Sequence, residues 1–453
     1  MSLPIKVGMV SLGCPKNQVD AEIMLHKIKE AGFQLETDAG LSDIVIINTC
    51  GFIESAKQEA IDQILEFLTL KQEGRIKKVI VTGCLAERYA EEIVKEMPEV
   101  DAVVGLGCNG DIVEILKSTL SGEEIRRIGE KCDLPLEGER VLYSLPFSAY
   151  LKIAEGCDNR CAYCAIPSIR GPFRSRPMEN IVSEAESLAA RGVKELIIVA
   201  QDTTKYGQDL YGEYKLAELL RKLARIEGFT WIRVLYAYPE RITDELLQVM
   251  AEEPRIAKYL DIPLQHCDGD ILKAMNRPGD QKSLKALIRH VREMVPGITL
   301  RTTLIAGFPG ETKDQFKKLC QFVRDMRFDR LGCFAYSEEE GTPAAEMEPR
   351  VPEEERARRA EIITEEQNNV LSRKNDAMLG KTVQVLVEGS DRWGECWFGR
   401  SEADAPEIDG KIFFTAGKKP RPGQFVWVRI DETMDLDLTG VQVEGPEEDA
   451  AEV

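Results

Sequence analysis

The amino-acid sequence predicts an α/β protein built in three parts: an open parallel sheet, a partial (βα) barrel and a small all-β barrel. Apolar runs alternate with helical periodicity up to about residue 140, and again from residue 147 to residue 376. Short β-rich runs punctuated by Gly and Pro follow from about residue 380. A length of 453 residues is sufficient for about three domains.

The first part is expected to span residues 1–125. Apolar strand-like runs occur at Val7–Val10, Ile44–Ile47 and Val79–Val81, and segments with helical periodicity fill the gaps between them. Apolar runs that alternate with helices indicate a parallel sheet buried on both faces. Residues 126–146 interleave Gly, Pro and charged residues without a clear period, so we expect a linker there.

The second part, residues 147–376, continues the alternation of strands and helices. Its six strand candidates are Ala149–Ala154, Glu195–Gln201, Trp231–Tyr236, Tyr259–Pro263, Thr299–Ala306 and Leu331–Tyr336. Six such units fit a partial (βα) barrel, whose active site would lie at the carboxyl ends of the strands. A charged helical segment from Pro352 to Lys374 is expected to close this domain.

The third part, residues 377–445, changes character. Its five short strand candidates are Thr382–Val387, Cys396–Phe398, Ile412–Thr415, Phe425–Ile430 and Val441–Val443, which suggest a small β-barrel. From Gly380 to Glu444 the chain carries eight basic and twelve acidic residues, a net charge of −4. Residues 446–453 read as an acidic, disordered tail.

The bulk composition indicates a cytoplasmic protein without a membrane partner. Hydrophobic residues make up 43% of the chain and charged residues 30%, and neither a signal-peptide pattern nor a long apolar stretch is found. Twelve cysteines in such a chain suggest a reducing compartment, where thiols bind metals or pack in cores. The formal charge of −19 disfavours non-specific nucleic-acid binding and favours a basic partner.

Three closely spaced cysteines, Cys157, Cys161 and Cys164, follow the first strand of the second part. Their spacing is Cys-x3-Cys-x2-Cys, with the aromatic Tyr163 just before the last cysteine. Three thiolates this close can hold three irons of a 4Fe–4S cubane and leave the fourth iron open to a substrate or cofactor. The alternatives fit less well, because structural zinc would need a fourth Cys or His nearby and buried core cysteines would not need polar neighbours such as Asp158.

A second set of cysteines, Cys14, Cys50 and Cys84, ends the three strands of the first part. Ligands in open parallel sheets gather outside the carboxyl ends of the strands, so these cysteines should converge in space. The small residues Gly13 and Gly83 would let the backbone approach a bulky inorganic group. We therefore expect a second three-cysteine cluster with one open iron; the alternative is three unrelated core cysteines.

The two cysteine sets and the final β-rich part, in this order, resemble the methylthiotransferases of the radical S-adenosylmethionine (SAM) superfamily. The resemblance covers essentially the whole chain and includes Leu304-Ile-Ala-Gly-Phe-Pro-Gly-Glu-Thr312 and Tyr336-Ser-Glu-Glu-Glu-Gly-Thr-Pro343. It implies a flavodoxin-like N-terminal domain, a radical SAM barrel and a C-terminal TRAM barrel. It also implies two 4Fe–4S clusters, one on each cysteine set, and SAM as a further cofactor.

Four segments are similar to the RimO branch of this family, which modifies a ribosomal protein. They are Ser11-Leu-Gly-Cys-Pro-Lys-Asn17, Lys152-Ile-Ala-Glu-Gly-Cys157, Leu260-Asp-Ile-Pro-Leu-Gln-His266 and Arg400-Ser-Glu-Ala-Asp-Ala-Pro-Glu-Ile-Asp409. The resemblance implies that a methylthio group is added to the β-carbon of an aspartate in the twelfth small-subunit ribosomal protein. The substrate would be this protein either free or assembled in the ribosomal subunit. A 5′-deoxyadenosyl radical would abstract the hydrogen, and the cluster on Cys14, Cys50 and Cys84 would supply sulfur. The sequence does not identify the electron donor.

Contacts to SAM or substrate are expected from Tyr163 and from four polar residues at predicted strand ends. These four are Gln201, Gln265, Arg301 and Tyr336. For each of them the alternative of a polar residue that merely ends a strand stays open. No catalytic side chain is expected beyond the cluster cysteines.

Two other functions stay open. One is a tRNA adenosine methylthiotransferase, which is less favoured because a TRAM barrel that grips tRNA should be basic and this one is net acidic. The other is an iron–sulfur or sulfur carrier without enzymatic activity, which would not cleave SAM.

Overall fold

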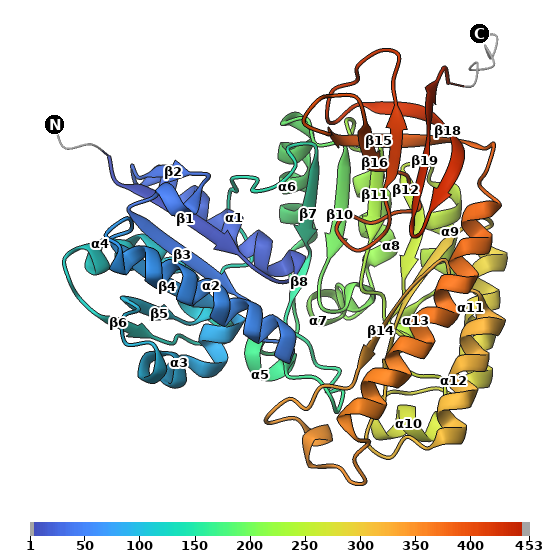
Figure 1. Ribbon diagram of the computed structural model, residues 1–453, viewed down its shortest axis with the longest axis horizontal. Helices are drawn as coiled ribbons and strands as arrows, with labels where there is room; N and C mark the ends of the chain where they lie inside the picture. The colour runs from blue at the N-terminus through green and yellow to red at the C-terminus, as the bar shows by residue number, and fades with distance from the viewer. Residues whose placement is uncertain (1–3, 446–453) are drawn as a thin grey trace.

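The computed structural model describes residues 4–445 and arranges them as three parts (Figure 1). The N-terminal part, drawn in blue, lies beside the green to orange central part, and the red C-terminal barrel caps one end of the central part. The acidic tail predicted at residues 446–453 lies outside the described residues. No helix between residues 4 and 445 is both long enough and apolar enough to cross a membrane.

Six parallel strands form the first sheet, in the order β2-β1-β3-β4-β5-β6. Its elements are β1 (Lys6–Ser11), α1 (Pro15–Glu30), β2 (Gln34–Glu36), β3 (Ile44–Thr49), α2 (Glu54–Gln72), β4 (Lys78–Gly83), α3 (Cys84–Glu96), β5 (Ala102–Val104), α4 (Ile112–Leu120) and β6 (Ile125–Arg127). The order 2-1-3-4-5 is that of flavodoxin-like sheets, so the expected fold is confirmed. The edge strand β6 lies in a segment where the sequence shows no clear period.

A second parallel sheet follows, and its six strands neighbour one another in chain order, β7-β10-β11-β12-β13-β14. The strands are β7 (Ser148–Lys152), β10 (Glu195–Val199), β11 (Trp231–Val234), β12 (Ile256–Asp261), β13 (Thr299–Ala306) and β14 (Arg330–Ala335). The helices are α6 (Met178–Ala190), α7 (Gln208–Tyr211), α8 (Leu216–Ala224), α9 (Asp244–Glu252), α10 (Gly269–Ala274), α11 (Gln281–Met294), α12 (Lys313–Met326) and α13 (Glu353–Asp376). Strands in this order connected through helices form a partial (βα) barrel, as the sequence predicts.

The inner face of this partial barrel is covered by the two other parts of the chain. Tyr150, Ile197 and Tyr259 project from β7, β10 and β12 into one buried apolar cluster. Val19 of α1 enters the same cluster from the N-terminal part, and Ala405 enters it from the C-terminal part. Val19 and Ala405 are both apolar and buried, so the three parts of the chain share one hydrophobic core. This shared core fixes the positions of the three parts relative to one another.

Five strands close the C-terminal barrel in the order β15-β16-β17-β19-β18, which confirms the expected small β-barrel. They are β15 (Thr382–Ser390), β16 (Trp397–Arg400), β17 (Ile412–Thr415), β18 (Phe425–Met434) and β19 (Asp437–Val443). Arg400 donates to the buried carboxylate of Glu195 at 2.6 Å, and Phe425 packs edge-on against Trp231 with ring centroids 4.8 Å apart. Glu195 and Trp231 begin β10 and β11, so the C-terminal barrel sits at the amino ends of these strands.

The outer surface of the C-terminal barrel is close to neutral, although its composition is acidic. Between residues 380 and 444, seven basic and six acidic residues are exposed. Several of the other carboxylates are used internally: Glu388 accepts from Arg400 at 2.6 Å, and Asp409 accepts from the Tyr259 hydroxyl at 2.6 Å. The net negative charge of this part of the sequence therefore does not produce an acidic outer surface.

Candidate functional site

A cavity of about 370 Å³ lies between the N-terminal part and the central barrel, at the carboxyl ends of the strands. The structure brings all six predicted cysteines to its wall: Cys14, Cys50, Cys84, Cys157, Cys161 and Cys164. The predicted ligand sets come from two different sheets, yet they line one space. The site therefore belongs to both parts of the chain.

The first cysteine set is assembled from three strand ends that press closely together. A Cβ atom placed on Gly13 would lie 2.6 Å from the Cβ of Cys50, so only glycine fits beside Cys14. Gly13 also has a φ of 89°, in the left-handed region that glycine adopts without strain. Cys14 is the N-cap of α1 and Cys84 is the first residue of α3, so the positive ends of two helix dipoles face this set.

The second cysteine set is carried by a single loop. The loop leaves the short ribbon of β8 (Ala154–Glu155) and β9 (Arg174–Ser175) and ends in α5 (Ile166–Arg170). Two backbone hydrogen bonds hold it in place, from Cys157 N to Gly171 O at 3.1 Å and from Ala162 N to Met275 O at 2.9 Å. These bonds fix the path of the loop and thereby the positions of its three thiols.

The donor set fits a cubane cluster better than a single ion. Within residues 4–445, no group of three or more His, Cys, Asp or Glu side chains converges closely enough to hold one metal ion. A cubane does not require such convergence, because each thiolate binds a different iron at a different corner. Two sets of three thiols around one cavity match this wider arrangement.

Burial keeps most of these thiols protonated in the metal-free protein. It raises the pKa of Cys84 to about 12 and that of Cys157 to about 11. At Cys14 burial acts in the same direction, but the cations of Lys16 and Arg170 and nearby backbone N–H groups lower the pKa below its usual value. Because a bound thiol must be deprotonated, cluster assembly has to release protons from this cavity.

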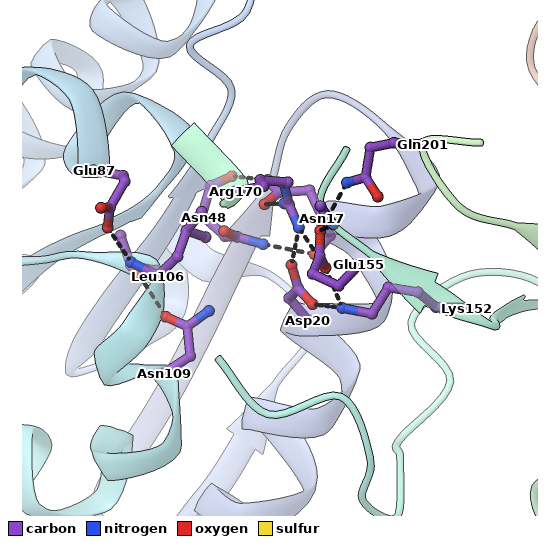
Figure 2. A network of polar contacts seen from close by, with 12 residues as sticks. Asn17, Asp20, Asn48, Glu87, Leu106, Asn109, Lys152, Glu155, Arg170 and Gln201 are labelled. Atoms are coloured by element: carbon purple, nitrogen blue, oxygen red, sulfur yellow. Dashed lines mark hydrogen bonds and ion pairs between the residues drawn. The ribbon is translucent and has the colours of Figure 1, made fainter. Parts of the chain in front are cut away.

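A buried network of charged side chains joins α1, which follows Cys14, to the strands and helix around the loop of Cys157, Cys161 and Cys164. Figure 2 shows its members Asp20, Lys152, Glu155 and Arg170. Arg170, six residues after Cys164, donates to Asp20 of α1 at 3.0 Å and to Glu155 of β8 at 2.9 Å. Lys152 bonds the same two carboxylates. All four side chains are at most 2% exposed, so the two cations and two anions satisfy one another without water.

Three of the five expected SAM or substrate contacts line the cavity: Tyr163, Gln201 and Gln265. Gln201 donates to Glu155 at 2.7 Å, while its buried Oε1 has no hydrogen-bond partner among the described residues. Such an orphaned acceptor suits a donor group on a bound molecule. Gln265 has a φ of 70°, a strained conformation that hydrogen bonds to the neighbouring β13 hold on both sides of the residue.

The other two expected contacts, Arg301 and Tyr336, do not line this cavity in the described part of the chain. Arg301 donates to Asp261 at 3.1 Å. Tyr336 packs edge-on against Phe308, with ring centroids 5.4 Å apart, in a cluster that also contains Tyr163. Tyr336 therefore supports the cysteine loop from behind.

Sequence reasoning missed three cations that line the cavity: Lys16, Arg170 and Arg277. Arg277 donates to Pro263 O at 2.6 Å, and its other nitrogen lies 3.9 Å from the Cys161 sulfur. A signal existed for two of them, because Lys16 and Arg170 lie within six residues of a cluster cysteine. Arg277 lies in a loop far from either cysteine set in sequence, and only the fold places it there.

Comparisons with known protein families divide the chain in the same order. The "Uncharacterized protein family UPF0004" matches residues 6–105 and the "Radical SAM superfamily" matches residues 151–323. A "TRAM domain" matches residues 379–443.

Three relatives resemble the chain over almost its full length, and each is named "Ribosomal protein uS12 methylthiotransferase RimO". The relative from Pelotomaculum thermopropionicum is 49% identical, over 97% of this chain and 99% of its own. Those from Geobacter sulfurreducens and Desulforamulus reducens are 48% and 47% identical, each over 96% of this chain and 98% of their own.

Solved structures show the same fold at much lower identity. The radical S-adenosylmethionine methyltransferase TsrM from Kitasatospora setae superposes with a TM-score of 0.56 at 14% identity, covering 75% of this chain and 74% of that one. The cobalamin-dependent S-adenosylmethionine radical enzyme OxsB gives a TM-score of 0.50 at 15% identity, over 80% of this chain and 56% of that one. At these identities the likeness concerns the fold alone.

Proposed function

The chain belongs to the family of the ribosomal protein uS12 methylthiotransferases, RimO, and we propose that it adds a methylthio group to the β-carbon of an aspartate in uS12. The relatives match over nearly the full length of both chains, so the proposal concerns the whole enzyme and not one domain. It is a transferase of the radical SAM type.

One observation carries the proposal: two three-cysteine sets line a single cavity. An enzyme that only cleaved SAM would need one such set. A second set facing the same space is what sulfur insertion requires, because the radical site and the sulfur must reach the same carbon atom. The depth of burial around both sets supports the exclusion of water, which a radical reaction needs.

The protein residues bind and orient groups whose chemistry belongs to the cofactors. When bound, two 4Fe–4S clusters and SAM supply the radical that removes hydrogen from the substrate carbon, and the methylthio group that replaces it. Cys157, Cys161 and Cys164 would hold one cluster, and Cys14, Cys50 and Cys84 the other. Arg277 lies beside the set of Cys157, Cys161 and Cys164, where the N–H group that faces Cys161 would stabilise negative charge on its sulfur.

For SAM, we propose contacts from Tyr163, Gln201 and Gln265, with Tyr336 and Arg301 acting through neighbours. The proposed domains are the auxiliary-cluster domain at 1–125, a linker at 126–146 whose first two residues complete β6 of the first sheet, the radical SAM domain at 147–376 and the TRAM domain at 377–445. A basic ribosomal protein as partner and oxygen-sensitive thiol ligands both agree with a reducing cytoplasm as the place of action.

The test is mass spectrometry of uS12 after anaerobic incubation with the cluster-loaded enzyme, SAM, a reductant and a sulfur source. The expected result is one methylthio group per uS12 on an aspartate, together with 5′-deoxyadenosine. An enzyme that holds both clusters and cleaves SAM but leaves uS12 unmodified would contradict the proposal.

A tRNA adenosine methylthiotransferase is kept as a second candidate because of the outer surface of the C-terminal barrel. Lys418, Lys419 and Arg421 are exposed in one short loop of a nearly neutral face, so the surface does not oppose RNA binding by its charge. The same incubation with bulk tRNA, followed by nucleoside analysis, separates the two candidates. Methylthioadenosine in tRNA with unmodified uS12 would favour the second candidate.

A further inference from the structure

The cavity is basic although the chain as a whole is strongly acidic. Three cations line it, Lys16, Arg170 and Arg277, and no Asp or Glu among the described residues does. The complete chain carries a formal charge of −19. A local excess of positive charge in such a chain indicates that the cavity receives anionic groups.

Two of the three cations already have partners. Arg170 is bonded to Asp20 and Glu155 within the buried network. Arg277 donates to Pro263 O, and its guanidinium stacks 4.0 Å above the ring of Tyr238. Arg170 is therefore neutralised by carboxylates, whereas Arg277 has no carboxylate partner among the described residues and directs its donors to Pro263 O and the Cys161 sulfur, beside the loop of the other cysteine set.

Lys16 lies beside Cys14 instead. The residue is 7% exposed, and its Nζ forms no ion pair with a carboxylate among residues 4–445; the charged and polar groups that face it are Tyr236, Cys14 and Arg170. The ammonium lies 3.5 Å from the centre of the Tyr236 ring, which projects from the end of β11 on the opposite wall. A cation–π contact compensates only part of the cost of burying an ammonium group.

The position of Lys16 is well defined. Pro15 begins α1 and fixes the backbone of the first turn, so Lys16 leaves the helix two residues after Cys14. Tyr236 has a φ of 63°, and its N–H donates to Asp261 at 3.1 Å, which holds the ring over the cavity. The ammonium therefore stands between the first cysteine set and the barrel wall.

We propose that Lys16 binds the carboxylate of the substrate aspartate. This inference rests on the proposed function and deepens it, since it names the group that selects an acidic side chain. The carboxylate is bonded directly to the β-carbon, so a charge-assisted hydrogen bond from Lys16 would hold the reacting carbon one bond away from the anchored group. Lys16 is a positioning and specificity residue, and the carboxylate completes the ion pair that the protein lacks.

A second role could explain the same cation: it could serve as counter-charge for the cluster on Cys14. The two roles give different results, because only the first makes the effect of Lys16 depend on the substrate carboxylate. A double-mutant cycle between enzyme and substrate measures that dependence directly.

The experiment measures anaerobic binding of uS12 to the cluster-loaded enzyme by titration calorimetry. The partners are native enzyme and Lys16→Met, each with native uS12 and with uS12 whose target aspartate is replaced by asparagine. The expected result is that this Asp→Asn change weakens binding to the native enzyme by about tenfold or more and to Lys16→Met by less than about twofold. The control, Lys29→Met, alters an exposed lysine of the same helix and should keep the native response.

Iron content and the electron paramagnetic resonance spectrum show whether both clusters are intact in Lys16→Met. If they are not, Lys16→Gln, which keeps a polar side chain of similar length, replaces it. If the Asp→Asn change weakens binding of uS12 equally in the native and variant enzymes, the inference is overturned. If, in addition, Lys16→Met shifts the reduction potential of the cluster, Lys16 serves as counter-charge for the cluster instead. Native enzyme that neither binds nor modifies uS12 would instead overturn the proposed function, and this inference with it.

Discussion

The two cysteine sets of the cavity are built in different ways. Cys157, Cys161 and Cys164 lie on one loop, so eight consecutive residues carry the whole set. Cys14, Cys50 and Cys84 come from three strand ends, and their proximity depends on the register of β1, β3 and β4. The local set depends on the path of one loop, whereas the distributed set depends on the register of three strands.

Their electrostatic surroundings differ as well. The distributed set has Lys16, Arg170 and two helix N-termini beside it, and the pKa of Cys14 is lowered. At Cys157 burial, with a smaller contribution from the nearby carboxylate of Asp202, raises the pKa to about 11. Within the distributed set, Cys14 is therefore the position that best accommodates negative charge, whereas burial raises the pKa of Cys84 to about 12.

The largest expected effect follows from removing the local set. Replacing Cys157, Cys161 and Cys164 by Ala should abolish the formation of 5′-deoxyadenosine, because no thiolates remain to hold the cluster that reduces SAM. Chromatography of the products measures this. The exposed Cys132→Ala variant is the control and should behave as the native enzyme. Continued SAM cleavage by the triple variant would contradict the assignment.

Removing the distributed set should have a different outcome. With Cys14, Cys50 and Cys84 replaced by Ala, SAM cleavage should remain detectable, while methylthio transfer to uS12 should be lost. The physical reason is that the two sets have separate ligands although they share a cavity. Mass spectrometry of uS12 and 5′-deoxyadenosine analysis of the same samples report both steps. Methylthiolated uS12 from this variant would show that Cys14, Cys50 and Cys84 are dispensable.

A smaller effect is expected from Arg170→Leu, which leaves every cysteine in place. Asp20 and Glu155 would lose one of their two buried cations, and breaking a buried pair costs about 3–5 kcal/mol. Urea denaturation of the cluster-free protein should show this loss of unfolding free energy. The exposed Arg289→Leu should change it by less than about 0.5 kcal/mol. Equal values for the two variants would mean that the network does not stabilise the fold.

The smallest effect on stability is expected from replacing single glycines by alanine. Comparing Gly13 with Gly32 distinguishes the cost of backbone strain from the cost of a steric contact with the distributed set. Gly13 and Gly32 have almost the same φ, 89° and 88°, but an added Cβ meets Cys50 at Gly13 and nothing within 4 Å at Gly32. Gly32→Ala should cost about 1–2 kcal/mol of unfolding free energy and leave iron content unchanged. Gly13→Ala should in addition reduce the iron bound by the distributed set alone. Unchanged iron in Gly13→Ala would show that Cys50 can move without loss of the site.

The sequence was sufficient for what depends on local pattern. All three parts of the fold were predicted correctly, because apolar runs and their spacing determine strands and helices. The strands β2, β5 and β6 were missed, since three residues each are too few to show a period. The clustering of Cys14, Cys50 and Cys84 was predictable because parallel strands end at one edge of a sheet.

What the sequence could not provide depends on packing between the parts. Arg277 reaches the cavity only because α10 and the loop after it fold back over the cysteine loop. The acidic composition of the C-terminal barrel suggested an acidic surface, but Glu388 and Asp409 turn inward to Arg400 and Tyr259. The net charge of a domain does not show which of its charged side chains are paired where the domain packs against its neighbour.

Iron analysis with Mössbauer spectroscopy decides whether both cysteine sets hold a cluster beside one cavity. We expect about eight irons per chain in the loaded native protein, and about four in each triple-cysteine variant, all in 4Fe–4S form. Native protein that binds only about four irons, or a triple variant that keeps about eight, would contradict this expectation.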